Sequence, residues 1–205
     1  MTAGTAPTGP VIRSATAPLL GERRSDALAL LTPAERSRFA TESQPERFLA
    51  GRMLLRELVA DLAGRDLASI TVTAACPDCG AEHGKPVIDG VFVSLSHAGE
   101  VVVAAASTTA PVGVDVEPRD GGAFRGATER VAAIRLVAGG DDLQHWTRVE
   151  AVLKADGRGL RVDPTEVGIR ADRATLDGVG YALTDASDDE HVISIASRLA
   201  GVGSQ

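Results

Sequence analysis

The first clear pattern of apolar and polar positions along the chain is helical. Thr32 can cap a helix, Pro33 suits the first helical position, and Glu35 lies three residues after the cap, as in a capping box. Pro45 marks a second start, after which apolar residues recur at spacings of three, four and seven. Gly64 suits the C-terminal end of that helix. The pattern therefore predicts two consecutive helices, of which the second is amphipathic.

Beyond these helices the apolar period shortens to two, which is typical of strands. Strands are predicted at 69–74, 91–96, 101–107, 112–117, 165–170, 180–184 and 191–197. A further helix is predicted at 143–156, and 123–137 is weakly helical, while the small, polar first dozen residues are expected to fray. Because each half runs from helix to strands, we expect an α+β fold of two packed halves, 1–110 and 111–205.

The composition narrows the class of protein. With 205 residues, 44% of them hydrophobic and 24% charged, the chain can bury a substantial core and is not expected to be disordered. A net charge of −7 argues against a general nucleic-acid binder. The sequence shows no apolar run of membrane-spanning length and no signal-peptide pattern, so we expect no membrane partner and a cytoplasmic location.

An acidic strand is the first candidate for chemistry. In the segment VGVDVE, Asp115 and Glu117 point to one face while the three valines point to the other. Two carboxylates at this spacing lie about 7 Å apart and repel unless a cation lies between them. One interpretation is a solvent-exposed strand face. The other is a site for Mg²⁺, which takes one or two carboxylates together with water and phosphate oxygens.

The helix predicted at 143–156 supplies possible partners for that strand. Glu150 and Lys154 are four residues apart and share a face, either as an ordinary surface pair or as a third carboxylate beside a phosphate-binding cation. Trp146 is interpreted as a core residue. Ser96 and His97 end a predicted strand, where His97 either caps the turn or, if protonated, donates to a phosphate.

Taken together, five segments resemble the 4′-phosphopantetheinyl transferases, specifically the larger surfactin-type members. In the order in which that family carries them, they are AGRMLLREL, HGKPV, SLSHAG, GVDVE and WTRVEAVLKADGRGL, which span about residues 47–160. The resemblance implies two similar α/β halves packed as a pseudo-dimer within a monomeric chain. It also implies an enzyme that uses Mg²⁺ to transfer the phosphopantetheine arm of coenzyme A to a serine of an apo acyl or peptidyl carrier protein, releasing adenosine 3′,5′-bisphosphate.

The resemblance also implies roles for particular residues. Asp115, Glu117 and Glu150 would be the Mg²⁺ ligands, and Glu150 would also serve as the base for the carrier serine. The implied contacts to coenzyme A are Lys154 at the pyrophosphate, Ser96 and His97 at phosphate or ribose groups, Lys85 beside the nucleotide, and Arg52 or Arg47 at the 3′-phosphate. Lys85 and Lys154 are the only lysines in a chain with nineteen arginines.

Two departures from the family keep an alternative open. Val149 stands where relatives often carry lysine, so that one phosphate contact is missing or comes from Arg148. Glu35 stands where relatives often have a basic residue, a role that Arg36 or Arg38 could take. The alternative is a non-catalytic relative that binds coenzyme A or a carrier protein without turnover.

The segment CPDCGAEHG requires a separate interpretation. Cys76 and Cys79 are expected as thiols or metal ligands and not as a structural disulfide. With His83 they resemble part of a zinc site, but a structural zinc ion needs four ligands and no second pair is present. One interpretation is a turn stiffened by two thiols beside the nucleotide, and the other is a small zinc-binding interaction module.

Overall fold

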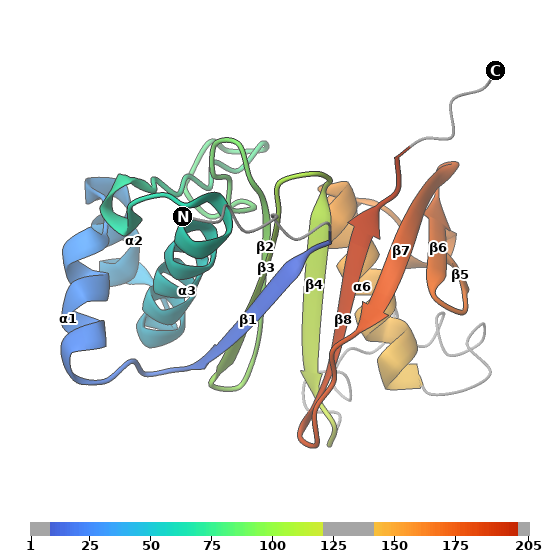
Figure 1. The fold of residues 1–205 in the computed structure, drawn as a ribbon, viewed down its shortest axis with the longest axis horizontal. Helices are drawn as coiled ribbons and strands as arrows, with labels where there is room; N and C mark the ends of the chain where they lie inside the picture. Colours follow the sequence, from blue (N-terminus) through green and yellow to red (C-terminus); the bar gives the residue numbers. More distant parts are fainter. Residues whose placement is uncertain (1–8, 121–141, 201–205) are drawn as a thin grey trace, which may run out of the picture. The chain divides into compact units, whose positions relative to one another are not determined.

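The chain divides into two compact units in a computed structural model that describes residues 9–120 and 142–200 (Figure 1). The first unit comprises Met1–Leu95 and Glu100–Thr109, and the second comprises Ser96–Gly99 and Ala110–Gln205. The division thus differs from a single cut after residue 110, because the four-residue segment Ser96–Gly99 groups with the second unit. The weakly helical stretch 123–137 lies outside the described residues.

The first unit packs helices against an antiparallel sheet (Figure 1). Its elements are β1 (Val11–Thr16), α1 (Gly21–Leu30), α2 (Pro33–Thr41), α3 (Pro45–Ala63), η1 (Leu67–Ser69), β2 (Phe92–Ala98) and β3 (Val101–Ser107). The strand order is β1-β3-β2, and β1 pairs antiparallel with β3. Helix α3 contacts both β1 and β3, and its fully buried Leu54, Leu55 and Val59 belong to the core of this unit.

Both predicted helices in this unit are confirmed, with their termini. The Thr32 hydroxyl accepts from the Glu35 backbone N–H at 3.2 Å, and the Glu35 carboxylate accepts from the Thr32 N–H at 2.9 Å, which completes the capping box. Helix α3 begins at Pro45 and ends before Gly64, which adopts a left-handed φ of +63°.

Two expectations for the first unit were wrong, and one helix was missed. Residues 69–74 form no strand, because apart from the bridge between Thr73 and Val87 no neighbouring strand pairs with them. Strand β1 includes two of the residues expected to fray. Helix α1 was not predicted, because its N-cap is Leu20, whose side chain makes no capping hydrogen bond and gives no start signal.

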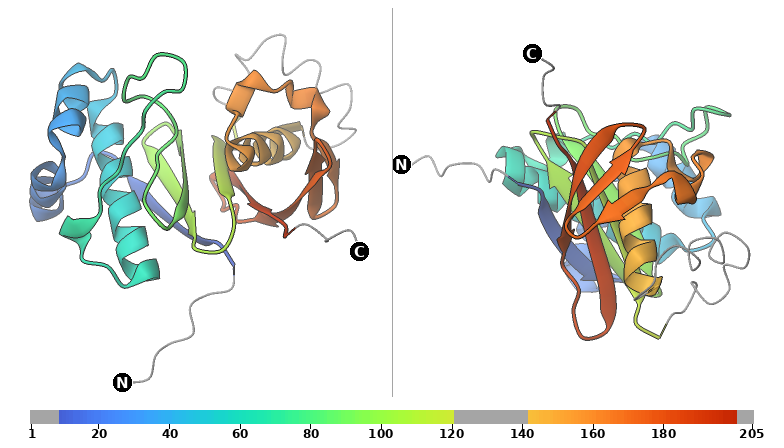
Figure 2. Two further views of the ribbon diagram at one scale, coloured as in Figure 1. Left: turned by 90° about the horizontal axis from the view of Figure 1, so that it is seen from above. Right: turned by 90° about the vertical axis from the view of Figure 1, so that its right-hand side faces the viewer.

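The second unit curves an antiparallel sheet around one long helix (Figure 2). Its elements are β4 (Val112–Pro118), α6 (Asp142–Asp156), η2 (Gly159–Arg161), η3 (Pro164–Glu166), β5 (Gly168–Arg170), β6 (Arg173–Leu176), β7 (Val179–Asp185) and β8 (His191–Arg198). The strand order is β4-β8-β7-β6-β5. Val149, Val152 and Leu153 of α6 pack with Tyr181 and Ala196 of the sheet to form a second hydrophobic core.

The α+β class is confirmed, whereas the pseudo-dimeric arrangement stays a prediction. Each unit sets a long helix against an antiparallel sheet, but one sheet has three strands and the other has five. The predicted helix at 143–156 and the strands at 112–117, 180–184 and 191–197 are present. The strand predicted at 165–170 is reduced to β5, and the short β6 was not predicted. Across the described residues, no helix is both long and apolar enough to cross a bilayer.

A buried ion-pair network ties α3 to the first turn of α2 and to Ile70, which directly follows η1. Arg56 is 1% exposed and donates from Nη2 to Glu35 Oε2 at 2.6 Å and from Nε to the Ile70 carbonyl at 3.2 Å. Arg52 Nε lies 3.1 Å from Glu35 Oε1, and its guanidinium carbon lies 4.7 Å from the centre of the Phe48 ring. Burial lowers the pKa of Arg52 to about 10, so the side chain stays charged at neutral pH.

We expect Arg56→Leu to destabilise the protein by about 3 kcal/mol or more. The change removes one partner of the buried Glu35 carboxylate and the hydrogen bond that Arg56 donates to the Ile70 carbonyl. Arg23→Leu is the matched control. It removes a bidentate but exposed pair with Glu57, which is expected to cost about 1 kcal/mol or less. Urea unfolding monitored by circular dichroism measures both, and equal losses would contradict the importance of burial here.

Candidate functional site

The candidate site depends on a close approach between strand β4 and helix α6. At Gly113, an added Cβ would lie 2.0 Å from the Ala151 carbonyl oxygen and 2.4 Å from the Ala155 nitrogen. No other residue fits there without moving the helix, because backbone atoms cannot yield as a flexible side chain can. Gly113, Asp115 and Glu117 alternate with the valines of β4, so the acidic side chains share the face that α6 covers.

A second contact anchors α6 at the same level of the sheet. Thr147 and Ser194 are both buried, and their hydroxyl oxygens are 2.8 Å apart in a hydrogen bond. Ser194 on β8 pairs directly with Asp115 on β4. The hydroxyl pair therefore helps to fix the height of the helix relative to the acidic strand.

Three predicted site residues meet at one carboxylate oxygen. Asp115 Oδ1 accepts from the Ser96 hydroxyl at 2.8 Å and from Lys154 Nζ at 2.6 Å, and Lys154 Nζ also lies 2.8 Å from Ser96 Oγ. Asp115 is 5% exposed, so the interpretation of this strand face as solvent-exposed is wrong. A buried carboxylate needs such compensation, and Lys154 supplies the opposite charge.

Glu117 is on the same face of β4 as Asp115 but is less buried, and the charges of Asp115, Glu150 and Lys154 act on it. Desolvation raises the pKa of its carboxyl to about 7, with further increases from the negative charges of Asp115 and Glu150 that outweigh the opposing effect of Lys154. The Trp146 side chain donates a hydrogen bond to Glu117, which partly offsets the rise. Trp146 is in the core, as predicted, but its polar contact was missed because the sequence alone does not show which way an indole N–H points.

These acidic groups suit a hard cation, although they do not surround one point closely. Asp115 Oδ2 is buried and has no hydrogen-bond partner, which leaves one oxygen available to a ligand. Desolvation, together with the negative charges of Asp115 and Glu150, raises the pKa of Glu117, as expected for a carboxyl group with little water and like charges nearby. Within the described ranges, the donor atoms of Asp115, Glu117 and Glu150 do not all lie within 4.8 Å of one another. Mg²⁺ needs one or two carboxylates and completes its octahedron with water and phosphate, so the donor set fits.

The remaining predicted residues lie elsewhere. His97 is exposed on β2, in the segment that groups with the second unit. Arg47, Arg52 and Lys85 belong to the first unit, where Arg52 is buried in the ion-pair network and Lys85 is exposed. Their contacts to coenzyme A stay predictions.

The substitutes suggested for the missing basic residues have structural partners of their own. Arg36 donates to the Leu31 and Ala29 carbonyls at the end of α1, and Arg38 donates to Glu42 and to the Glu82 carbonyl. Arg148 donates to the Ala171 carbonyl at 3.4 Å. Val149 is fully buried in the core of the second unit, so a lysine at this position would have to leave that core.

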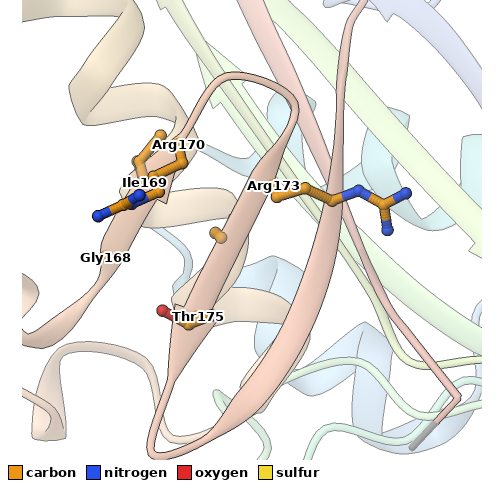
Figure 3. Close-up of a pocket in the computed structure, with 6 residues that line it drawn as sticks. Gly168, Ile169, Arg170, Arg173 and Thr175 are labelled. Carbon is orange, nitrogen blue, oxygen red and sulfur yellow. The ribbon is translucent and has the colours of Figure 1, made fainter. Parts of the chain in front are cut away.

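A pocket elsewhere in the second unit offers a different surface. It has a volume of about 230 Å³ and is formed by the β5–β6 hairpin, with Gly168, Ile169, Arg170, Arg173, Ala174 and Thr175 as its lining. The Arg173 guanidinium extends away from the other labelled side chains, so the two arginines do not converge on one ligand position (Figure 3). None of the predicted site residues lines this pocket.

We expect Gly113→Ala to destabilise the second unit and its candidate site, because the added methyl group must push α6 away from β4. The first unit should be affected less. The separation of Lys154 from Asp115 would then increase. The measurement is thermal unfolding of the variant and of the parent chain, each with and without added Mg²⁺. Gly168→Ala is the control, because the nearest atom to its Cβ would be the Thr175 hydroxyl oxygen at 3.0 Å, and the nearest backbone atom would lie at 3.9 Å. Unchanged stability in Gly113→Ala would contradict the close approach.

The raised pKa of Glu117 predicts a pH-dependent stability in a chelator. The folded state holds the proton up to about pH 7, whereas the unfolded carboxyl releases it near its ordinary value of 4.5. Stability from this group is therefore full below pH 4.5 and is lost as the pH rises through 7. We expect Glu117→Gln to be more stable than the parent chain at pH 8 by about 1 kcal/mol, after allowance for solvent screening.

Glu100→Gln, at an exposed position, is the control for that experiment. The two variants are compared with the parent chain by urea unfolding at pH 5.5 and pH 8. A Glu117→Gln difference that is the same at both pH values would argue against the raised pKa.

Comparisons with known proteins leave this site to be interpreted from its own chemistry. No protein-family model matches the chain, and no curated protein matches it. The arrangement of Ser96, Asp115, Glu117 and Lys154, together with the five sequence segments, is therefore the basis for any functional conclusion.

Proposed function

We propose that the chain transfers the 4′-phosphopantetheine arm of coenzyme A to a serine of an apo carrier protein. The observation that carries the proposal is the meeting of Ser96, Lys154 and the buried Asp115. The first two residues are 19 and 39 positions from Asp115, and the three come from three of the five segments on which the family resemblance rests. Their convergence in space supports the proposal.

The charges of this site suit a pyrophosphate. Asp115 offers a buried oxygen without a partner, and desolvation together with nearby negative charges raises the pKa of Glu117. Glu150 contributes to that rise, so it acts on the same small region. When bound by these residues, Mg²⁺ would neutralise negative charge on the diphosphate. Lys154, which is partly exposed beside Asp115, would contact the phosphate as a point charge.

The proposed reaction requires positioning more than covalent participation by the protein. The carrier serine oxygen forms a bond to the phosphorus attached to the pantetheine arm, and the bond from that phosphorus to the oxygen of adenosine 3′,5′-bisphosphate breaks. The serine proton passes to a base, for which Glu150 is our candidate. Lys154 and His97 would stabilise the negative charge that accumulates on the departing bisphosphate.

The test is transfer itself. Purified protein is incubated with coenzyme A, Mg²⁺ and a panel of apo acyl and peptidyl carrier proteins, and the carriers are analysed by intact mass spectrometry. We expect a mass gain of one phosphopantetheine that requires Mg²⁺ and disappears with a chelator. Binding of coenzyme A without any mass gain across the panel would instead support the non-catalytic alternative.

Substitutions at the site should separate metal binding from phosphate binding. Asp115→Asn and Glu150→Gln should each lower kcat by about 100-fold or more, since loss of one stabilising group at the reacting centre commonly costs 10²–10³-fold. Lys154→Ala should lower kcat while the KM for the carrier stays within about twofold. Asp61→Asn, at an exposed position of the first unit, is the control. A Lys154→Ala effect confined to the carrier KM would contradict the phosphate role.

A further inference from the structure

The loop between η1 and β2 holds a cluster of side chains that the proposed reaction does not use. Cys76, Cys79 and His83 each offer one donor atom, and the three atoms all lie within 4.8 Å of one another. Cys79 Sγ is 3.0 Å from His83 Nε2. In the described part of the chain this is the one group of three such residues that is so compact. We propose that this cluster binds a zinc ion.

The backbone of the loop holds the donors in place without help from a metal. Thr73 and Val87 exchange backbone hydrogen bonds of 3.1 and 2.8 Å, which close the base of the loop. Within it, the Cys76 N–H donates to the Ala81 carbonyl at 2.7 Å, and the Gly80 N–H donates to the Cys76 carbonyl at 2.8 Å. A site that is largely formed before binding loses less conformational entropy when the ion arrives.

Two glycines allow this tight path. Gly80 directly follows Cys79 and has a φ of +74°, a conformation that side chains rarely adopt. Gly84 directly follows His83, and an added Cβ there would lie 2.5 Å from the Ala75 carbonyl oxygen. The chain therefore turns after Cys79, and the residue after His83 passes close to Ala74 and Ala75, which directly precede Cys76.

Zinc binds cysteine as the thiolate. The backbone N–H groups of Asp78 and Cys79 donate to the Cys76 sulfur, which helps to fix its position in the loop. Cys76 is 8% exposed, while Cys79 and His83 are exposed, so an ion can enter from the solvent side. Neither cysteine is in a disulfide.

The donor set selects zinc among the common metal ions. Two thiolates and one imidazole suit a tetrahedral borderline-soft cation, whereas Mg²⁺ and Ca²⁺ require oxygen ligands. Zinc–sulfur bonds of about 2.3 Å place two sulfurs about 3.8 Å apart in a tetrahedron. That separation is compatible with the donor atoms of the cluster, which all lie within 4.8 Å of one another. Two thiolates also balance the charge of the ion. Three protein ligands leave a fourth position for water or an external ligand, so the absence of a second cysteine pair does not argue against the site.

Bound zinc would join the two ends of the segment Cys76–His83 and limit its motion. The loop is tied to α2 as well, because Arg38 donates to the Glu82 carbonyl. The inference does not depend on phosphopantetheine transfer, because every residue that carries it lies in the first unit and none is assigned to the reaction.

Direct metal analysis of the full chain tests the proposal. The protein is purified without a polyhistidine tag under reducing conditions, equilibrated with zinc, dialysed, and analysed by mass spectrometry for metal content. We expect one zinc ion per chain. Cobalt substitution should add the thiolate-to-cobalt charge-transfer absorption and the intense visible bands of a tetrahedral complex. A chain that keeps no zinc and shows no such absorption overturns the proposal.

Variants identify the ligands. Cys79→Ser and His83→Ala change exposed side chains, so both should fold, as circular dichroism will show. Each should weaken zinc binding by about 100-fold or more, because loss of even an outer partner of a zinc ligand costs about 10–100-fold. His191→Ala, in the second unit, is the matched control and should bind zinc as the parent does. Undiminished binding in Cys79→Ser and His83→Ala would assign the zinc to another place and refute the site.

Discussion

The candidate site depends on one ion pair. The Asp115 carboxylate can be buried as a charged group only if Lys154 lies next to it. The lysine is on a helix and the aspartate on a strand, so their 2.6 Å separation requires the two elements to pack almost backbone to backbone. Gly113 permits that approach by having no side chain, and the Thr147–Ser194 hydroxyl pair sets its level. Without this packing, the acidic face of β4 would have to be exposed to water or protonated.

Local patterns in the sequence predicted which residues share a face but not which faces meet. The alternation in β4 placed Asp115 with Glu117, and the helical spacing placed Glu150 with Lys154. Neither pattern could show that Asp115 is buried, because burial depends on α6, which begins 27 residues after Asp115. The family resemblance supplied that connection, and the hydrogen bonds around Asp115 now provide a physical reason to consider it.

The misses in the fold have similar causes. Capping residues marked α2 and α3 correctly, whereas α1 lacks a capping side chain and could be found only through its packing on α3. Residues 69–74 alternate as a strand does, yet apart from one bridge they have no strand to pair with. Arg52 shows a related limit, because its position in the motif predicts a ligand contact, which stays a prediction, but did not show that Glu35 and Phe48 hold the side chain in the interior.

The grouping of Ser96–Gly99 with the second unit makes that unit discontinuous in sequence. A fragment expressed from residue 111 onward would lack the Ser96 hydroxyl, so Asp115 and Lys154 would lose a shared partner even if the sheet and α6 assembled. Shuffling of the two halves between related chains would face the same problem, since any junction near residue 110 separates this serine from its aspartate. The site is thereby linked in sequence to a strand that begins in the other unit.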